Sequence, residues 1–449
     1  MTPIKIVLWG FLAAISGLWL LAEPIFGIPQ QFAPIRAALI NYTGIIGISV
    51  MSLAMILAVR PVFAERWFDG LDKMYRLHKW LGITALIFAV SHWISAKAPH
   101  WLIDLGLMER RGRGPRPEIT DPIALFFREQ RGLAEGLGEW AFYAAVFLIA
   151  LALIKIFPYR LFHKTHILLA VAYLVLVFHA VVLMKFSYWG DAVGIATGIL
   201  MAAGTVSAIV LLAKTSGLAR PVVGQIENIE YNAPNHVLKV DVKLASRWPG
   251  HDAGQFAFVT FDDAEGAHPF TISSSWQRDG RLTFLIKELG DYTRTLPGTL
   301  AAGQKVKIEG PFGRFDFQSE KERQVWIAGG IGISPFIARM QALASDRNST
   351  DVNSTKPVDL FYATAAENLA EFLPRIQERA EAAGVNLHVI RSPRDGLLRA
   401  KDIMGAIPKW KDADLWFCGP EGFGKSLRQD FVAAGLPTTD FHQEYFQMR

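Results

Sequence analysis

Residues 78–92 read HKWLGITALIFAVSH, an apolar run that begins and ends with a histidine. Residues 166–179 read HILLAVAYLVLVFH and repeat this arrangement. Long apolar runs are typical of membrane-spanning helices, in which a polar side chain is costly and usually serves a function. The two runs therefore indicate two helices of a membrane domain, each with one histidine near either end.

The sequence before Ala213 contains six stretches without Asp, Glu, Lys or Arg, and most approach the roughly 20 residues that cross a bilayer. They are Ile6–Ala22, Ala37–Val59, Trp80–Ala96, Trp140–Ile154, Ile167–Met184 and Ala192–Ala213. We predict six transmembrane helices, the fourth of which needs Gly136–Glu139 to reach a full span. An even number of spans places both termini on one side. The charged segment from Lys97 to Glu135 is then expected to be a long outer loop.

The histidine spacing predicts two metal sites at different depths. Fourteen residues of helix rise about 21 Å, and thirteen rise about 20 Å. The third and fifth helices run in the same direction, so His78 meets His166 at the inner level and His92 meets His179 at the outer level. At about 100° per residue, fourteen residues return within about 40° of one face, but thirteen leave a mismatch of about 140°. Tilt, local unwinding or side-chain rotamers of the fifth helix must absorb this difference.

The remaining composition limits the chemistry. Cys418 is the one cysteine among 449 residues. An iron–sulfur cluster needs about four thiolates, and a c-type haem needs a Cys-x-x-Cys-His run. A redox metal must therefore be held mainly by other ligands, of which histidine is the obvious one. The formal charge of +5 comes without a basic stripe, so no nucleic-acid partner is expected.

The sequence after Lys214 is typical of a soluble region. Six β-rich segments of even spacing predict a small antiparallel barrel: Val222–Tyr231, Val237–Leu244, Gln255–Phe261, Phe270–Ser275, Arg281–Lys287 and Lys305–Glu309. Strands and helices then alternate, which predicts a parallel α/β sheet. Its strands are expected at Val325–Ala328, Val358–Ala363, Leu387–Ile390 and Asp414–Phe417, and its helices at 334–345, Leu369–Ala383 and Gly422–Ala434.

A glycine-rich turn follows the first strand of this α/β region. It reads Gly329-Gly330-Ile331-Gly332 and precedes a predicted helix. Glycines let the backbone approach a pyrophosphate, whose charge the helix N-terminus stabilises. A plain tight turn is the alternative, and the position within a βα unit favours the phosphate-binding interpretation.

The membrane half resembles the ferric reductase-like transmembrane domain shared by NADPH oxidases and ferric reductases. The resemblance lies in His78-Lys79-Trp80 with His92, and in Thr165-His166 with His179, at spacings of fourteen and thirteen. It implies two b-type haems, the inner held by His78 and His166 and the outer by His92 and His179. Histidines that only pack between helices are the alternative.

The soluble half resembles the ferredoxin-reductase-type flavoprotein module that is fused in NADPH oxidases. This resemblance implies FAD and NADPH or NADH as cofactors. On the flavin side it rests on the flavin-contacting motif His268-Pro269-Phe270-Thr271, the FAD diphosphate cap Gly290-Asp291-Tyr292-Thr293 and the barrel-to-sheet junction Gly310-Pro311-Phe312-Gly313. On the nucleotide side it rests on the pyrophosphate loop, from Gly329, Gly330 and Gly332 to Pro335, and on the nicotinamide-side loop Cys418-Gly419-Pro420.

Three further assignments follow from the same resemblance. Glu444-Tyr445-Phe446 resembles the aromatic lid that stacks on the flavin ring, with Phe446 favoured over Tyr445. Cys418 is expected to pack beside the nicotinamide and not to act as a nucleophile. Arg391 and Arg394 follow the third strand of the α/β region and slightly favour NADPH, because arginine suits a 2′-phosphate.

The resemblance implies three domains: a six-helix haem domain at 1–216, an FAD-binding barrel at 217–320 and an NAD(P)H-binding α/β domain at 321–449.

Electrons are expected to pass from cytosolic NAD(P)H through FAD and both haems to an acceptor beyond the membrane. Dioxygen, giving superoxide, and a ferric complex are the first choices, and a periplasmic protein or a quinone is the alternative. The protein is expected to be multi-pass in the inner membrane, with its soluble module and both termini cytosolic. Arg36, at the outer start of the second helix, is a candidate partner of a haem propionate or of the acceptor.

Overall fold

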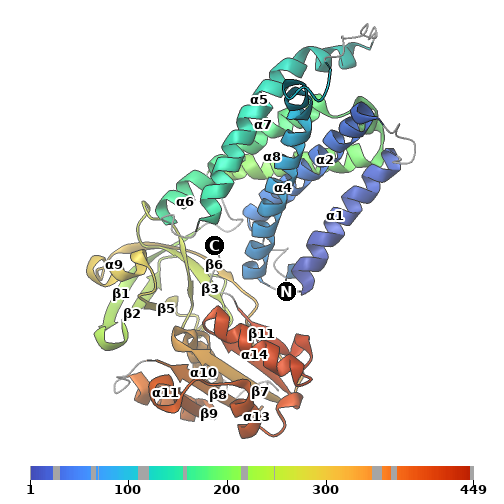
Figure 1. Cartoon of the computed structure of the whole chain (residues 1–449). Helices are drawn as coiled ribbons and strands as arrows, with labels where there is room; N and C mark the ends of the chain where they lie inside the picture. The colour runs from blue at the N-terminus through green and yellow to red at the C-terminus, as the bar shows by residue number, and fades with distance from the viewer. Residues whose placement is uncertain are drawn as a thin grey trace. The chain divides into compact units, whose positions relative to one another are not determined.

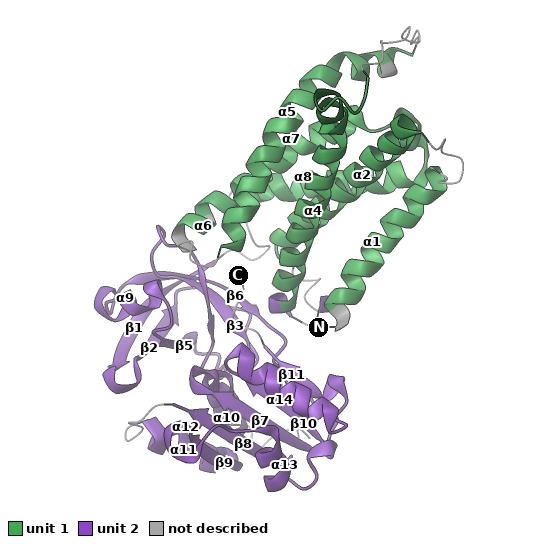
Figure 2. Cartoon of the chain, viewed as in Figure 1, with its two compact units in different colours: residues 1–64, 73–218, 449 green, residues 65–72, 219–448 purple. Residues whose placement is uncertain are grey.

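The computed structural model describes residues 2–23, 31–61, 67–68, 70–109, 121–154, 159–213, 221–246, 248–345, 356–365 and 372–444 (Figure 1). The chain divides into two compact units (Figure 2). The first comprises Met1–Ala64, Lys73–Leu218 and Arg449, and the second comprises Glu65–Asp72 and Ala219–Met448. The first unit is helical, and the second holds two sheets.

Six helical segments among the described residues are long and apolar enough to cross a membrane, which confirms the predicted number of spans. The helices of this unit are α1 (Thr2–Ala22), α2 (Phe32–Ala58), α4 (Leu71–Asp104), α5 (Pro122–Leu153), α6 (Tyr159–His166), α7 (Leu168–Leu183) and α8 (Ala192–Leu212). Large apolar side chains such as Trp9, Trp140 and Ile199 are exposed on this unit, as a surface facing lipid requires.

The prediction of a long outer loop from Lys97 to Glu135 is wrong, because most of the described residues of this segment are helical. Helix α4 continues to Asp104, and α5 already begins at Pro122, while residues 110–120 lie outside the described part of the chain. We drew the spans as charge-free runs, but charged residues do not end a helix. The Arg131–Glu135 pair, four residues apart at 2.9 Å, is of the kind that supports a helix.

The fifth span is interrupted directly after its inner histidine. Helix α6 ends at His166, Ile167 is a turn whose φ of −63° and ψ of −25° remain helical, and α7 begins at Leu168. By contrast, α4 is one continuous helix through both of its histidines.

Polar contacts join three membrane helices in the middle of the unit. In Figure 1, α5 lies along α7 and α2 along α8. The buried Tyr173 hydroxyl of α7 lies 2.8 Å from Ser52 Oγ of α2 and donates to the Met201 carbonyl of α8 at 3.3 Å. Gly204 leaves the space for this ring, because an added Cβ would overlap the hydroxyl. Small residues with hydrogen-bonding groups are typical of contacts between membrane helices.

The first sheet of the second unit is antiparallel, as predicted, with the order β4-β3-β6-β1-β2-β5. Its strands are β1 (Val222–Asn232), β2 (Val237–Leu244), β3 (Phe256–Thr260), β4 (His268–Thr271), β5 (Arg281–Lys287) and β6 (Lys305–Phe312). A bridge between Ile272 and Phe284 joins the end of β4 to β5, which closes the barrel. In β2, the buried positions alternate with less buried ones, as in a strand with one face on a core.

The fourth strand begins earlier than predicted, at His268 instead of Phe270, and ends at Thr271. Pro269 cannot donate a ladder hydrogen bond, but β4 is an edge strand, where proline is tolerated. Helix α9 (Asp291–Thr299), which we did not predict, follows Gly290.

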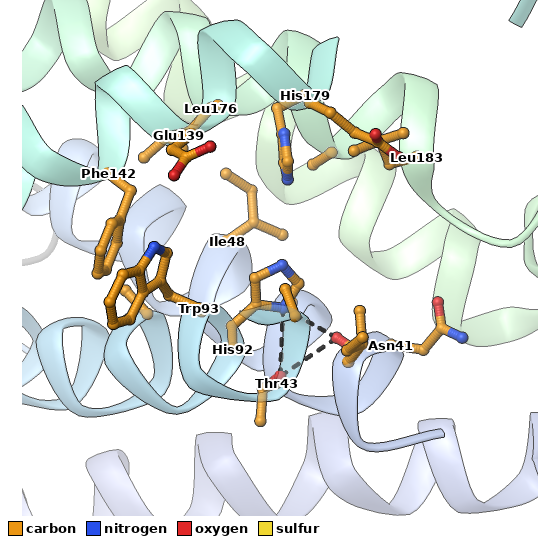
Figure 3. Close-up of a pocket in the computed structure, with 18 of the residues that line it drawn as sticks. Asn41, Thr43, Ile48, His92, Trp93, Glu139, Phe142, Leu176, His179 and Leu183 are labelled. Carbon is orange, nitrogen blue, oxygen red and sulfur yellow. Dashed lines mark hydrogen bonds between the residues drawn. The ribbon is translucent and has the colours of Figure 1, made fainter. Parts of the chain in front are cut away.

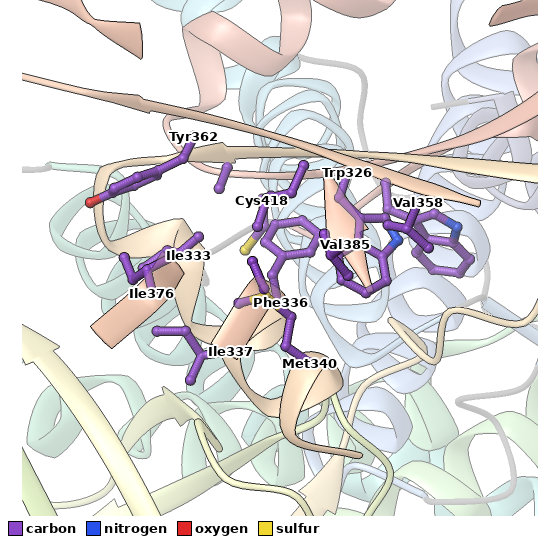
Figure 4. Close-up of a cluster of buried hydrophobic side chains, with 14 of the residues drawn as sticks. Trp326, Ile333, Phe336, Ile337, Met340, Val358, Tyr362, Ile376, Val385 and Cys418 are labelled. Carbon is purple, nitrogen blue, oxygen red and sulfur yellow. The ribbon is translucent and has the colours of Figure 1, made fainter. Parts of the chain in front are cut away.

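The second sheet is parallel, as predicted, with the order β11-β10-β7-β8-β9. Its strands are β7 (Arg323–Gly329), β8 (Val358–Thr364), β9 (Val385–Arg391), β10 (Ala413–Cys418) and β11 (Phe441–Gln443), the last of which was missed. Helices α10 (Ser334–Ser345) and α11 (Phe372–Ala383) pack on one face (Figure 4), and α13 (Ala400–Ala406) and α14 (Glu421–Ala433) pack on the other. Packing on both faces explains why β8 and β10 are buried at every position, without alternation.

Candidate redox sites

The structure brings together the histidines of each expected pair. The ring centroids of His78 and His166 are 5.9 Å apart, and those of His92 and His179 are 6.2 Å apart. When two imidazoles bind opposite sides of one metal, each nitrogen lies about 2 Å from it and the ring centres lie about 6 Å apart. The spacing in both pairs therefore fits a single metal between two axial imidazoles.

Backbone carbonyls set the orientation of three of these rings. Nδ1 of His78 donates to the Ala54 carbonyl at 3.0 Å, Nδ1 of His92 to the Ile40 carbonyl at 3.0 Å, and Nδ1 of His179 to the Ala134 carbonyl at 2.8 Å. A carbonyl only accepts, so Nδ1 carries the proton and Nε2 keeps a lone pair. Metal-binding histidines almost always use their second nitrogen in this way.

A cavity of about 900 Å³ surrounds the outer pair. Figure 3 shows the rings of His92 and His179 pointing toward one another across it. Apolar side chains form much of the wall, including Ile48, Phe142 and Leu176. The Thr43 hydroxyl oxygen, Oγ1, lies 3.2 Å from Nδ1 of His92.

Two glycines that we did not predict make room for the outer rings. A Cβ on Gly138 of α5 would overlap the His179 ring, and a Cβ on Gly44 of α2 would lie 3.2 Å from Cε1 of His92. Their signal in the sequence is glycine inside an apolar span, which costs helix stability and so needs a packing or functional reason.

The outer cavity fits a b-type haem in the spacing of its ligands. Its lining contains the cations Arg36, Lys97, Arg131 and Lys185 and the two acids Glu135 and Glu139. Lys97 pairs with Glu139, Arg131 with Glu135, and Lys185 with Glu23, so three of the four cations are already balanced by a carboxylate. The described residues hold no group of three or more His, Cys, Asp or Glu that could hold a metal. Paired histidines suit a porphyrin, which itself supplies the remaining four ligands.

The expected flavin motif lies at the edge of the barrel. His268 stacks on Tyr292 with ring centroids 4.3 Å apart, and its Nε2 lies 3.4 Å from Glu265 Oε1. Burial, followed by the charges of Glu265 and Asp262, raises the pKa of Tyr292, so this phenol is neutral. Pro269 and Phe270 are half-buried, and Thr271 is buried.

The second flavin motif forms the start of α9. The Thr293 hydroxyl accepts from the backbone N–H groups of Leu289 and Gly290 at 3.0 and 3.1 Å. Asp291 is exposed, and a Cβ on Gly290 would meet nothing within 4 Å. The open space beside a helix N-terminus fits a bound diphosphate.

The glycines of the predicted pyrophosphate loop have two different roles. Gly330 has a φ of +56°, which disfavours other residues, and an added Cβ there would point into open space. A Cβ on Gly332 would overlap the Cys418 carbonyl, and one on Gly329 would lie 2.7 Å from Pro420. A Cβ on Gly419 would lie 3.0 Å from Gly329. Three glycines therefore hold the two predicted nucleotide loops together, while Gly330 leaves a hollow before α10, whose buried Pro335 lies in the first turn.

The remaining predicted residues lie around this loop edge. Cys418 is fully buried among apolar side chains (Figure 4), and burial, followed by the charge of Glu444, raises the pKa of its thiol. The Glu444 side chain is itself buried. Tyr445 and Phe446 lie outside the described residues. The Arg391 N–H donates to Asp395 at 2.9 Å, and Arg394 Nε donates to the same carboxylate at 2.7 Å.

Comparisons with known proteins match the membrane half and the soluble half of the chain to two different families. Residues 43–177 match the family described as ferric reductase like transmembrane component, and residues 225–329 match an FAD-binding domain family. The toluate 1,2-dioxygenase electron transfer component of Pseudomonas putida is 25% identical over 206 residues, which cover 43% of this chain and 58% of that protein. NADH-cytochrome b5 reductase 1 of Pyricularia oryzae is 29% identical over 186 residues, which cover 38% of this chain and 58% of that protein.

A flavohemoglobin structure from Malassezia yamatoensis aligns over 93% of this chain and 99% of its own, at 17% identity and a TM-score of 0.47. The chain spans about half the length of the curated relatives it matches.

The fold and the family matches define a multi-pass membrane flavoprotein of the oxidoreductase class. A region that matches a ferric reductase-like transmembrane component is thus followed by a region that matches an FAD-binding domain, in the order that the sequence motifs predicted.

Proposed function

We propose that this protein carries electrons from cytosolic NAD(P)H, through FAD and two b-type haems, to an acceptor at the outer face of the cell membrane. The observation that carries the proposal is the pair of histidine couples at two levels of the same two spans. Each couple has the spacing of axial ligands on one metal. The domain limits proposed are 1–216, 217–320 and 321–449.

The histidines would hold each haem by its iron, through the Nε2 atoms. A bis-histidine haem supplies one-electron transfer without an open coordination position. The carbonyls of Ala54, Ile40 and Ala134 keep His78, His92 and His179 in the tautomer whose Nε2 is free to bind iron. Gly44 and Gly138 keep the outer rings free of side-chain overlap.

The soluble module would hold the electron donor and the flavin. The bound FAD would supply the exchange between a two-electron hydride donor and one-electron transfer. His268 would contact the flavin, with Tyr292 supporting its ring, and the start of α9 would bind the FAD diphosphate. The hollow at Gly330 and the start of α10 would bind the NAD(P)H diphosphate. Phe446 would cover the flavin ring, and Cys418 would pack below the nicotinamide.

The chain path supports the proposed orientation. Helix α8 runs opposite to α7, so it ends on the side of His166 and His78, and the reductase module follows it. NAD(P)H is cytosolic, so this side is the cytosol, and the pair formed by His92 and His179 lies toward the outside. The proposed setting is the inner membrane.

Dioxygen is the acceptor that the outer cavity supports best. Lys97, Arg131 and Lys185 of the lining are each paired with a carboxylate, which weakens the attraction of the cavity for an anionic chelate. Much of the remaining wall is apolar. A small uncharged acceptor therefore suits it, and superoxide would be the product. Ferric complexes, a periplasmic protein or a quinone are the other candidates.

The test uses the full chain purified in detergent with FAD, haem and NADPH or NADH. We expect cytochrome c reduction in air that superoxide dismutase abolishes. Reduction of ferric chelates without oxygen, at a rate equal to the aerobic rate, would instead identify iron as the acceptor. A preparation that binds no haem despite an adequate haem supply would contradict the proposal as a whole.

A further inference from the structure

Helix α4 contains a proline about two turns beyond the outer histidine. Pro99 lies inside the helix, which continues to Asp104. Proline has no N–H, so in α4 the carbonyl of Ser95, four residues earlier, loses its helical donor. An unpaired carbonyl at membrane depth costs several kcal/mol, because lipid offers no replacement donor.

Arg36 of α2 supplies the missing hydrogen bond. Its Nε donates to the Ser95 carbonyl at 2.8 Å, and its Nη2 donates to the adjacent Ala96 carbonyl at 2.9 Å. The fork of the guanidinium fits two successive carbonyls, which the single nitrogen of a lysine does not. Arg36 thus joins the outer end of α2 to α4 at the carbonyl that Pro99 leaves open.

The same face of α2 also orients His92. Ile40 lies one helical turn after Arg36, and its carbonyl accepts the Nδ1 proton of His92 at 3.0 Å. Gly44, a further turn along, provides the space in which the His92 ring lies. One line of contacts between α2 and α4 is therefore formed by Arg36, Ile40 and Gly44. Arg36 fixes the outer end of this line.

We propose that Arg36 is a positioning residue for the outer haem, which acts by replacing the helix donor that Pro99 removes and so fixes α4 against α2 where His92 binds. This inference rests on the proposed function. It differs from the other role that the position of Arg36 allows, a charge contact with a propionate or with the acceptor.

Two substitutions at Arg36 separate these roles. Arg36→Lys keeps the charge but loses the fork, and Arg36→Met loses both. We expect both variants to lose the outer haem to a similar extent, with haem per FAD falling from two toward one and the low-spin signal of the outer haem weakened or shifted. An Arg36→Lys variant with the haem content and low-spin signal of the wild type would overturn the proposal.

Restoring the backbone donor gives the second test. Pro99→Ala returns an N–H to the Ser95 carbonyl, so Arg36→Met should cost far less haem in a Pro99→Ala background than in the wild type. Equal losses in the two backgrounds would overturn the proposal. If Pro99→Ala alone removes the outer haem, the comparison of Arg36→Lys with Arg36→Met still decides between the two roles.

A third measurement does not depend on haem. In protein produced without haem supplementation, Arg36→Met should lower the thermal unfolding temperature by several degrees, and Pro99→Ala should remove most of this difference. An unchanged unfolding temperature in Arg36→Met would overturn the proposal. Failure of the proposed function would look different, because the wild type itself would then bind no haem.

Discussion

At the scale of single residues, the four histidines could be predicted, but the groups that orient them could not. The histidines are rare polar residues in apolar runs, which makes them visible in the sequence. The carbonyls of Ala54, Ile40 and Ala134 have no such signal, because every residue carries a carbonyl. Which of them faces a ring depends on the packing of helices far apart in the chain.

Gly138 gives a direct test of this packing. In Gly138→Ala, the new Cβ would overlap the His179 ring, whose Nδ1 is fixed to the Ala134 carbonyl, so the ring cannot keep its position. We expect the outer haem to be lost, with haem per FAD falling from two toward one, as measured by the reduced-minus-oxidised spectrum. Gly17→Ala on α1 is the control, because its Cβ would meet nothing within 4 Å. Equal haem contents in the two variants would contradict this account of Gly138.

Cys418 allows a second prediction at this scale. Its side chain is fully buried, and burial followed by the Glu444 charge raises the pKa of the thiol. Only the thiolate reacts quickly with alkylating reagents, so the folded protein should remain unlabelled by a maleimide at pH 8. Denaturation should release one reactive thiol per chain, since the sequence contains one cysteine. Rapid labelling of the folded protein would show that this thiol is accessible.

At the scale of elements, the apolar spans and the alternating strands were predicted well, because the pattern of neighbouring residues in the sequence indicates each of them. The break at Ile167 was not located, although the angle between His166 and His179 required some irregularity. The strand β11 was missed because it has three residues, too few to show a period, and its place depends on pairing with β10. The start of β4 was predicted two residues late. Proline is tolerated in an edge strand, but an edge position cannot be recognised before the order of the strands is known.

The contact between β10 and β11 gives a prediction of pH dependence. Asp414 of β10 is buried and accepts hydrogen bonds from His442 Nε2 of β11, at 3.2 Å, and from the Ser319 hydroxyl. Burial alone would raise the pKa of Asp414, but the bonds from His442 and Ser319 outweigh it and lower the pKa. A carboxyl with a lowered pKa stabilises the fold above its unfolded pKa, and this stabilisation is lost as the pH falls through its folded pKa.

Asp414→Asn should therefore lower the free energy of unfolding by about 1–3 kcal/mol at neutral pH. The difference from the wild type should begin to shrink below about pH 4, the ordinary pKa of an aspartate, and should go on shrinking as the pH falls through the lowered pKa of Asp414 in the folded protein. Thermal unfolding followed by the release of flavin fluorescence measures both effects. The exposed Asp412→Asn is the control and should match the wild type throughout. A deficit of Asp414→Asn that persists unchanged into acid would show that charge is not the cause.

At the scale of the whole molecule, the two histidine pairs predict a fixed order of electron flow. In the proposed orientation, His78 and His166 form the inner pair, so this pair should receive electrons first. In His179→Ala, we expect NAD(P)H to reduce the flavin and the inner haem but no external acceptor. In His78→Ala, NAD(P)H should reduce the flavin alone, while dithionite, which does not depend on the flavin, still reduces the outer haem. Stopped-flow spectra under anaerobic conditions distinguish these cases. Reduction of the outer haem by NAD(P)H in His78→Ala would contradict the order, because electrons would then reach that haem without the inner pair.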